Sequence, residues 1–453
     1  MMNAAYIEGD TIAACATAPG EGGVAIVRVS GPDAERLMRK FFKKLPTEIE
    51  SHRMYYGHIV GAGEREEALC VLMRAPKSYT REDVCEFNIH GGSETVARLL
   101  RALYSAGARP AQPGEFTRRA FMNGRIDLSR AEAVMSVLRA RGDAALRASL
   151  REMDGGVARA VSDAEDALTG MLSEIGAALD FPEEIEQTSI EAGIAVKARK
   201  LAQSLKNACS RRSGDMLSRG LSAVLAGRPN VGKSSLMNAL LGCERAIVTR
   251  TAGTTRDVLT EEMTLNGYRV RLSDTAGIRV ASDEAERMGV ERAGAALKAC
   301  DMALMVLDIS QALLTTDEQA LDPSDERQIL VINKCDLPHA WDSSALEEKF
   351  AGRYVRVSAK TGEGLEDLRG MMSDFVARNA VSDAVFLHER HIECIERAVN
   401  CIDKAASSLE DSLPCDLAAM DLSGALSALG EITGRTTDLD VINRIFTDFC
   451  VGK

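Results

Sequence analysis

One segment near the middle of the chain constrains the fold more than any other. Ser222 to Ala226 is a short apolar run, and it leads directly into Gly227-Arg228-Pro229-Asn230-Val231-Gly232-Lys233-Ser234. A run with helical spacing, Ser235 to Leu241, comes next. Strand, loop and helix in this order are the context that the phosphate-binding pattern G-x-x-x-x-G-K-[ST] requires. The segment therefore predicts a P-loop in an α/β domain, rather than a glycine turn followed by a chance lysine.

The P-loop residues have separate predicted roles. Backbone N–H groups of the glycine-rich turn surround the phosphates, and Lys233 reaches the β- and γ-phosphate oxygens. The Ser234 hydroxyl is placed to bind Mg²⁺. This part of the nucleotide site comprises Asn230, Val231, Gly232, Lys233, Ser234 and Ser235.

Three later segments, each after a strand-like run, restrict the nucleotide to GTP. In Asp274-Thr275-Ala276-Gly277, the aspartate can hold Mg²⁺ through water and the Gly277 N–H can sense the γ-phosphate. In Asn333-Lys334-Cys335-Asp336, the last carboxylate can accept from the N1–H and 2-amino groups of guanine, a pairing that adenine cannot make. Ser358-Ala359-Lys360 completes the base pocket. A lone N-K-x-D would be weak, but four elements in register are typical of small GTP-binding proteins.

The residue that should position the attacking water is not obvious. Switch proteins of the Ras type use a glutamine directly after D-x-x-G, and Ile278 stands there in this chain. The carboxylates of Asp283, Glu284 and Glu286 follow within a few residues. Their plain interpretation is that of solvated charges at a helix start.

The loop between the P-loop helix and the next strand is expected to act as the effector loop. It reads T-R-T-A-G-T-T-R-D, and Thr255 is the predicted second protein ligand of Mg²⁺. Arg250 and Arg256 fit either catalytic fingers or solubilising surface charges. The loop adds to the predicted nucleotide site Thr249, Arg250, Thr251, Ala252, Gly253, Thr254 and Thr255.

Hydrophobic periodicity divides the rest of the chain. Residues 1–120 mix short strand-like runs with one amphipathic stretch and predict a small α/β domain. Helical rhythm fills 121–215 and returns in 380–453, on both sides of the α/β pattern of 216–379. We therefore expect a helical domain that is split by the inserted P-loop domain, its two parts packing together.

Several local signals set expected helix boundaries. Ser129-Arg130-Ala131-Glu132 has the spacing of a capping box. Apolar residues recur from Leu150 to Ile175, with Gly155-Gly156 as an expected interruption and Phe181-Pro182 as the expected end. Near the C-terminus, a predicted helical stripe comprises Val441, Ile445 and Phe449.

Composition excludes several classes of protein. No apolar run approaches the ~20 residues of a membrane span, and the first residues lack a basic and apolar leader. We therefore expect a cytoplasmic protein that does not enter a membrane. The 11 cysteines include no C-x-x-C pair, which argues against a zinc ribbon or a disulfide framework. A net charge of -12 means that any RNA contact must come from a local patch.

Taken together, the motifs resemble the MnmE (TrmE) family of tRNA modification GTPases over the whole chain. The resemblance includes G-R-P-N-V-G-K-S-S, T-A-G-T-T-R-D and D-T-A-G-I-R. It also includes Gly22 to Gly31, His90-Gly91-Gly92, Pro113 to Thr117, and the terminal Phe449-Cys450-Val451-Gly452-Lys453. The terminal F-C-x-G-K is the most specific of these, because other GTPases lack it.

The resemblance implies an architecture and partners. It implies an N-terminal domain that binds 5-formyltetrahydrofolate or a related folate, a split helical domain and an inserted Ras-like GTPase domain. It implies a homodimer through the N-terminal domains and a complex, heterotetrameric or larger, with a flavin-dependent MnmG-type protein. Driven by GTP hydrolysis, this complex would install an aminomethyl or carboxymethylaminomethyl group at C5 of the wobble uridine of certain tRNAs.

The resemblance also implies residue roles at matching positions. Glu286 would position the hydrolytic water through a second water, and G domains would meet across K⁺. The K⁺ ligands would be Asn230, Thr249, Thr251 and Thr254, and the Mg²⁺ ligands Ser234 and Thr255. The folate contacts would be Arg28, Glu86, Arg125 and Lys453, although Arg125 stands where the family pattern has lysine. Cys450 is either a nucleophile toward the base or an inert thiol.

Two other functions compete with this one. A ribosome-assembly GTPase of the Era or Der kind would carry a basic RNA-binding module after the G domain, whereas residues 380–453 hold 6 basic and 13 acidic residues. The second alternative is a folate-dependent one-carbon enzyme that needs no partner. It stays open because the sequence does not identify the residues that would transfer the carbon.

Overall fold

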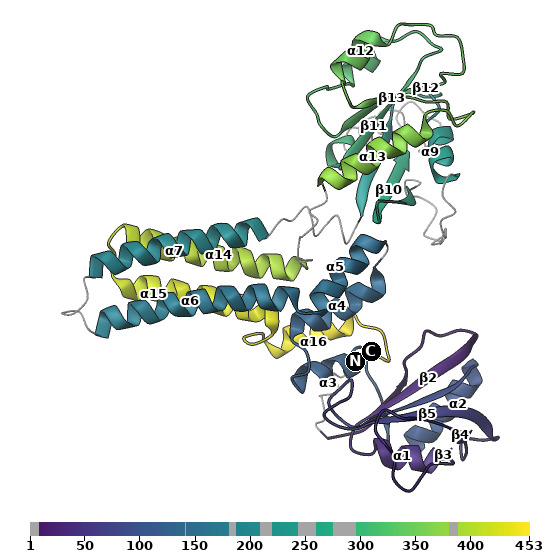
Figure 1. The fold of residues 1–453 in the computed structure, drawn as a ribbon, viewed down its shortest axis with the longest axis vertical. Coiled ribbons are helices and arrows are strands. Elements are labelled where there is room, and N and C mark those ends of the chain that lie inside the picture. Colours follow the sequence, from purple (N-terminus) through teal and green to yellow (C-terminus); the bar gives the residue numbers. More distant parts are fainter. Residues whose placement is uncertain are drawn as a thin grey trace, which may run out of the picture. The chain divides into compact units, whose positions relative to one another are not determined.

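In the computed structural model, the chain forms two compact units, which are described separately (Figure 1). One unit comprises residues 1–135, 152–205 and 393–453, and the other comprises 136–151 and 206–392. The structure describes residues 9–140, 142–180, 187–208, 220–242, 260–274, 296–379 and 388–453.

The first unit begins with a seven-stranded sheet in the order β3-β4-β5-β6-β2-β1-β7. Its pairs are antiparallel except β1 with β7. Apolar side chains of α1 and α2 cover one face of this sheet and form its core with the inward-facing strand residues. The elements are β1 (Ile12–Cys15), β2 (Gly22–Ser30), α1 (Ala34–Phe41), β3 (Phe42–Lys43), β4 (Met54–Ile59), β5 (Glu66–Met73), β6 (Val84–Gly91), α2 (Ser93–Ser105) and β7 (Arg109–Pro110).

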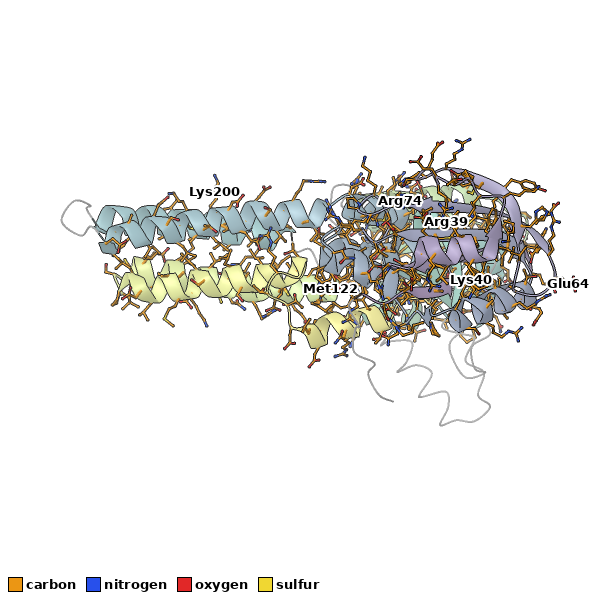
Figure 2. The ribbon with its side chains drawn as sticks, turned by 90° about the horizontal axis from the view of Figure 1, so that it is seen from below. Arg39, Lys40, Glu64, Arg74, Met122 and Lys200 are labelled. Carbon is orange, nitrogen blue, oxygen red and sulfur yellow. The ribbon has the colours of Figure 1, made fainter. Side chains whose placement is uncertain are left out.

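Helices from both sides of the inserted domain lie side by side. α6 packs along α15, and Arg199 of α7 pairs with Asp403 and Glu410 of α14. Both views show these four as one bundle, with Lys200 on its outer surface (Figures 1 and 2). The expected packing of the two helical parts is therefore confirmed. The helices are α3 (Glu115–Met122), α4 (Leu128–Arg139), α5 (Asp143–Met153), α6 (Gly156–Asp180), α7 (Gln187–Ala208), α14 (Glu389–Glu410), α15 (Cys415–Thr433) and α16 (Leu439–Thr447).

Helix boundaries follow the sequence signals with two corrections. α5 and α6 are separate on either side of Gly155, and α6 ends at Asp180, as expected. The capping box at Ser129 is wrong, because Asp127 accepts hydrogen bonds from the Arg130 N–H and the Ser129 hydroxyl and so caps α4 instead. The stripe predicted near the C-terminus is wrong at Val441, which is 41% exposed, whereas Phe449 is buried and Ile445 packs against the same apolar cluster. The buried apolar residues are Ile442 and Phe446 of α16 and Phe449, which follows it, and all three pack against α4.

A buried ion network ties α3 to the sheet domain. The Arg119 side chain is fully buried and contacts the carboxylates of Asp10, Glu82 and Glu115. Arg109 also pairs with Asp10 and Glu115. Although burial acts to raise the pKa values of Asp10 and Glu115, the two arginines hold both below their ordinary values.

The second unit contains a six-stranded sheet in the order β13-β12-β11-β8-β10-β9. All neighbouring strands are parallel except β9, which pairs antiparallel with β10. Leu236 of α9 and Leu368 of α13 belong to the apolar core on one face, and Phe350 lies in a second cluster. The elements are β8 (Leu221–Ala226), α9 (Lys233–Gly242), β9 (Thr260–Leu265), β10 (Tyr268–Asp274), β11 (Met302–Asp308), α11 (Thr315–Gln319), β12 (Gln328–Asn333), α12 (Ser344–Lys349), β13 (Tyr354–Arg356) and α13 (Leu365–Asn379).

The expected fold class is confirmed: an N-terminal α/β domain, a helical domain from two parts of the chain and an inserted P-loop α/β domain. Among the described residues, no helix has the length and apolar character needed to cross a membrane.

Candidate functional site

The P-loop joins β8 to α9 through backbone conformations that favour glycine. Gly227 and Gly232 have φ values of +145° and +98°, and Asn230 also has a positive φ of 68°. A Cβ at Gly227 would lie 2.3 Å from the Val306 carbonyl oxygen, so only glycine fits there. The loop is thus closely packed against β11, with its backbone available to face a ligand.

The Lys233 side chain folds back into the glycine-rich turn that precedes it. Its Nζ donates to the carbonyl oxygens of Gly227 at 2.6 Å and Arg228 at 2.7 Å. Burial lowers the pKa of Lys233, while the nearby Asp274 carboxylate acts in the opposite direction. The ammonium group is therefore held at the centre of the loop, where phosphate oxygens would meet it.

The residues expected at the Mg²⁺ site come together. Ser234, at the start of α9, donates its hydroxyl to Asp274 Oδ2 at 2.6 Å. Asp274 is the last residue of β10 and is buried. A hydroxyl and a carboxylate are oxygen ligands of the kind that Mg²⁺ prefers, so these two groups fit that ion.

The residues of the predicted base pocket also meet. Asn333, the last residue of β12, donates from Nδ2 to the Val231 carbonyl oxygen at 2.8 Å and accepts from the Ala359 N–H at 3.1 Å. The Ser358 hydroxyl donates to Asp336 Oδ1 at 2.7 Å. Asp336 and Lys360 are exposed. The Asn333 side chain therefore joins the P-loop to the two loops that would recognise the base.

Asp308 is a site residue that the motif search missed. Its Oδ2 accepts from Lys334 Nζ at 2.6 Å, and Lys334 also donates to the Asn230 carbonyl oxygen at 2.9 Å. Burial would raise the pKa of Asp308, but hydrogen bonds from Lys334 and Ser310 leave it below its ordinary value. Asp308 ends β11, just as Asp274 and Asn333 end β10 and β12, so its place in the sequence was the available signal.

The rest of the predicted nucleotide and hydrolytic site lies outside the described residues. It comprises Thr249, Arg250, Thr251, Ala252, Gly253, Thr254, Thr255, Thr275, Ala276, Gly277 and Glu286.

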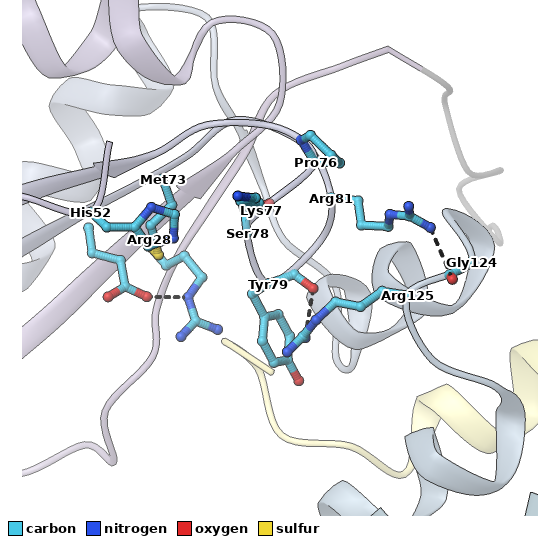
Figure 3. A pocket seen from close by; sticks show the side chains of 11 residues that line it. Arg28, His52, Met73, Pro76, Lys77, Ser78, Tyr79, Arg81, Gly124 and Arg125 are labelled. Atoms are coloured by element: carbon cyan, nitrogen blue, oxygen red, sulfur yellow. Dashed lines mark hydrogen bonds and ion pairs between the residues drawn. The ribbon is translucent and has the colours of Figure 1, made fainter. Parts of the chain in front are cut away.

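A second candidate site is a pocket of about 710 Å³ in the N-terminal domain (Figure 3). Arg28 of β2 and Glu86 of β6 stand opposite each other in the sheet, and Arg28 Nε donates to Glu86 Oε1 at 2.7 Å. Arg125, which follows α3, lines the same pocket. Three of the four predicted folate contacts are therefore brought together.

Tyr79 is the pocket residue that the sequence interpretation missed. The guanidinium carbons of Arg28 and Arg125 lie 4.9 Å and 4.8 Å from its ring centroid (Figure 3). Arg125 Nη1 also donates to the Tyr79 carbonyl oxygen at 2.9 Å. The only signal in the sequence was an aromatic residue within the basic segment Lys77-Ser78-Tyr79-Thr80-Arg81.

The C-terminal segment lies against the same part of the domain. The Gly114 N–H donates to the Cys450 carbonyl oxygen and the Phe116 N–H to that of Lys453, each at 3.2 Å. Arg28 Nη1 reaches the Gly452 carbonyl oxygen at 3.4 Å. Cys450 is exposed, and Lys453 is not one of the residues that line the pocket.

Comparison with known proteins identifies the chain. The family model "MnmE helical domain" matches residues 128–450, and "GTP-binding protein TrmE N-terminus" matches residues 11–125. The tRNA modification GTPase MnmE of Chloroflexus aurantiacus is 44% identical over 452 residues, which cover 98% of this chain and 100% of that protein. The chain belongs to the MnmE family.

Other MnmE proteins match over a similar extent. The tRNA modification GTPase MnmE of Moorella thermoacetica is 42% identical over 460 residues, or 98% of this chain and 99% of its own length. That of Enterococcus faecalis is 38% identical over 465 residues and covers both chains fully. The MnmE membership inferred from the motifs is thereby confirmed.

Proposed function

We propose that this protein hydrolyses GTP as part of tRNA modification. The observation that carries the proposal is the convergence of four motifs at the carboxyl ends of parallel strands. There Ser234 meets Asp274, and Asn333 joins the P-loop to the base-recognition loops. Ligands of open α/β sheets bind at this edge. The MnmE relatives, which are named tRNA modification GTPases, support the assignment.

The residues would divide the work of binding and hydrolysis. Asp336, oriented by Ser358, accepts from guanine, while the P-loop N–H groups and Lys233 hold the phosphates. Mg²⁺ bound by Ser234 and Thr255, and held through water by Asp274, would neutralise charge on the phosphates. Because Ile278 can neither donate nor accept, we assign water positioning to Glu286 on the basis of the family resemblance.

We further propose that K⁺ stimulates hydrolysis when two G domains meet. The proposed ligands are Asn230, Thr249, Thr251 and Thr254. A cation against the phosphates supplies the positive charge that an arginine finger supplies elsewhere. Hydrolysis should be faster in KCl than in NaCl at equal ionic strength, and equal rates would refute this part.

The N-terminal pocket is proposed to bind 5-formyltetrahydrofolate or a related folate, the source of the one-carbon unit. Arg28, Glu86 and Arg125 would contact it, with Lys453 contributed by the neighbouring C-terminal segment. Glu86 is the one carboxylate among the lining residues, and it can accept from the amino and N–H groups of a pterin ring. A pocket of about 710 Å³ suits a ligand of this size.

The proposed partners follow from the family and from one surface. Met54 and Tyr56 of β4 and Leu69 of β5 are 50%, 55% and 41% exposed, and Tyr56 stands opposite Leu69 in the sheet. This exposed apolar group supports a homodimer through the N-terminal domains. With a flavin-dependent MnmG-type protein, the dimer would modify C5 of the wobble uridine of certain tRNAs in the cytoplasm.

We divide this work among four segments. Residues 1–120 would bind folate and dimerise, 216–379 would hydrolyse GTP, and 121–215 with 380–453 would form the helical domain.

Substitution of Asp336 tests the nucleotide assignment. Asp336→Asn replaces an acceptor oxygen with a donor, so GTP affinity should fall about 10- to 100-fold. Xanthosine triphosphate, which carries a carbonyl where guanine has its amino group, should bind better than GTP. Titration of both nucleotides measures this exchange, and undiminished GTP affinity would place the base elsewhere.

A further inference from the structure

The N-terminal pocket carries different charge at its two ends. At the sheet end, Arg28 and Glu86 form an ion pair at 2.7 Å, so their charges cancel. The other cations that line the pocket are Lys77 and Arg81, of the loop between β5 and β6, and Arg125, which follows α3 (Figure 3). The lining residues supply no carboxylate besides Glu86. We call Lys77, Arg81 and Arg125 the basic end of the pocket.

The cations of the basic end differ from others in the same domain. Arg36, Arg53 and Arg101 each form an ion pair with a nearby carboxylate at 2.6 to 2.7 Å. Neither Lys77, Arg81 nor Arg125 pairs with a carboxylate anywhere in the described part of the chain. Three unneutralised positive charges therefore collect at one pocket of a protein whose net charge is -12.

Two of these cations are held in place by the backbone. Arg81 Nη1 donates to the carbonyl oxygens of Asn123 and Gly124, each at 3.1 Å. Arg125 Nη1 donates to the Tyr79 carbonyl oxygen, and its guanidinium lies over the Tyr79 ring. Each guanidinium still has N–H groups that can donate to a ligand. Because the two side chains are already fixed, they lose less conformational entropy when a ligand binds.

Like charges held together repel each other, and an anion between them relieves that repulsion. A ligand that fits the whole pocket has one uncharged end with hydrogen-bond donors for Glu86 and another end with several negative charges. We propose that the basic end is a subsite for the oligocarboxylate tail of a polyglutamylated folate. This inference rests on the proposed binding of folate, and it adds that the protein prefers folates with more than one γ-linked glutamate.

The test compares two probes, 5-formyltetrahydrofolate with one glutamate and the same folate with three. Calorimetric titration of the full chain should give about tenfold tighter binding of the triglutamate, as expected from one or two exposed ion pairs. Raising the salt concentration should reduce this ratio, because exposed charges are screened.

Variants separate the subsite from the rest of the pocket. Lys77→Gln with Arg81→Gln should bring the affinity ratio close to one while changing monoglutamate binding little. Arg101→Gln removes an exposed arginine of α2 and is the matched control, for which the ratio should be unchanged. Thermal melting checks that each variant is folded, and the ratio in the unsubstituted protein tests the proposal without any variant.

Three outcomes would overturn the inference. Equal affinity for the two folates in the unsubstituted protein would remove the subsite and leave the proposed folate binding intact. Failure of both folates to bind would refute the proposed folate binding together with this extension of it. Loss of tRNA affinity in the double variant, with the folate ratio unchanged, would assign the basic end to RNA phosphates.

Discussion

Arg28 Nη1 donates a hydrogen bond to the carbonyl oxygen of Gly452 at 3.4 Å and thereby joins residues 424 positions apart. The same guanidinium pairs with Glu86 and lies over the Tyr79 ring. The C-terminal segment is therefore part of the surroundings of the N-terminal pocket, the proposed folate site. A change in that segment should alter the pocket through Arg28.

Gly452→Ala should separate the C-terminal segment from the pocket. Gly452 has a φ of +96°, and an added Cβ would lie 2.2 Å from the Cys15 carbonyl oxygen, where the backbone has no room. The segment must move, so folate affinity should fall by about tenfold, as expected for the loss of one hydrogen bond to a charged group. Gly176→Ala is the matched control, because a Cβ there meets nothing within 4 Å. Unchanged folate affinity in a folded Gly452 variant would remove the segment from the site.

Asp308→Asn should weaken GTP binding without changing the chemical step. Lys334 would lose its carboxylate partner, so its ammonium group would be held less firmly against the Asn230 carbonyl oxygen of the P-loop. We expect KM for GTP to rise about tenfold, with kcat changed much less. The single tryptophan, Trp341, donates to the Asp308 carbonyl oxygen, so its fluorescence should report nucleotide binding directly.

The control for Asp308 is Asp342→Asn. Asp342 is exposed, and its carboxylate accepts only from Ser344 among the hydrogen bonds of the described residues. The KM for GTP should be unchanged in Asp342→Asn. A fall in kcat with an unchanged KM in Asp308→Asn would contradict the positioning role.

Arg119→Ala should destabilise the N-terminal domain strongly. The substitution leaves Asp10, Glu82 and Glu115 without the buried cation between them, which costs about 3 to 5 kcal/mol. Amide hydrogen exchange of α3 measures this loss within a protein of several domains. Arg36→Ala, which removes a half-exposed pair, should leave the exchange unchanged. Similar exchange in both variants would contradict the structural role of the network.

The same ion network should make the stability of the N-terminal domain depend on pH. The folded pKa values of Asp10 and Glu115 lie below their unfolded values of 3.8 and 4.5. Their contribution to stability is therefore fully present above about pH 4.5 and is lost as the pH falls through the lower, folded values. Exchange of α3 amides should accelerate in that acidic range in the unsubstituted protein, and less so in Arg119→Ala. Equal acid sensitivity of the two proteins would refute the link.

The sequence predicts well those parts of the site that are built from elements adjacent along the chain. Strand, glycine turn and helix are adjacent in the chain, and parallel strands bring their ends to one edge, so Ser234 and Asp274 were expected to meet. Asp308 obeys the same rule, but without a motif around it nothing distinguished it from other strand ends. Tyr79 is recognised as a site residue only from its contacts with Arg28 and Arg125, which belong to other parts of the fold and are brought to it by tertiary structure.

Side-chain competition and tertiary packing explain the errors. Both Asp127 and Ser129 are able to cap α4, and the carboxylate that accepts two hydrogen bonds does so. In α16, spacing alone fits either Val441 or Ile442 as the start of the apolar stripe. Packing against α4 selects Ile442, which no local pattern specifies.

The most direct measurement of the central claim is nucleoside analysis of tRNA from cells that lack this protein. In such cells the C5 substituent of the wobble uridine should be lost, and the intact gene should restore it. A gene carrying Ser234→Ala, which removes the hydroxyl paired with Asp274, should not restore it. Fully modified wobble uridine in cells without the protein would contradict the proposed role in tRNA modification.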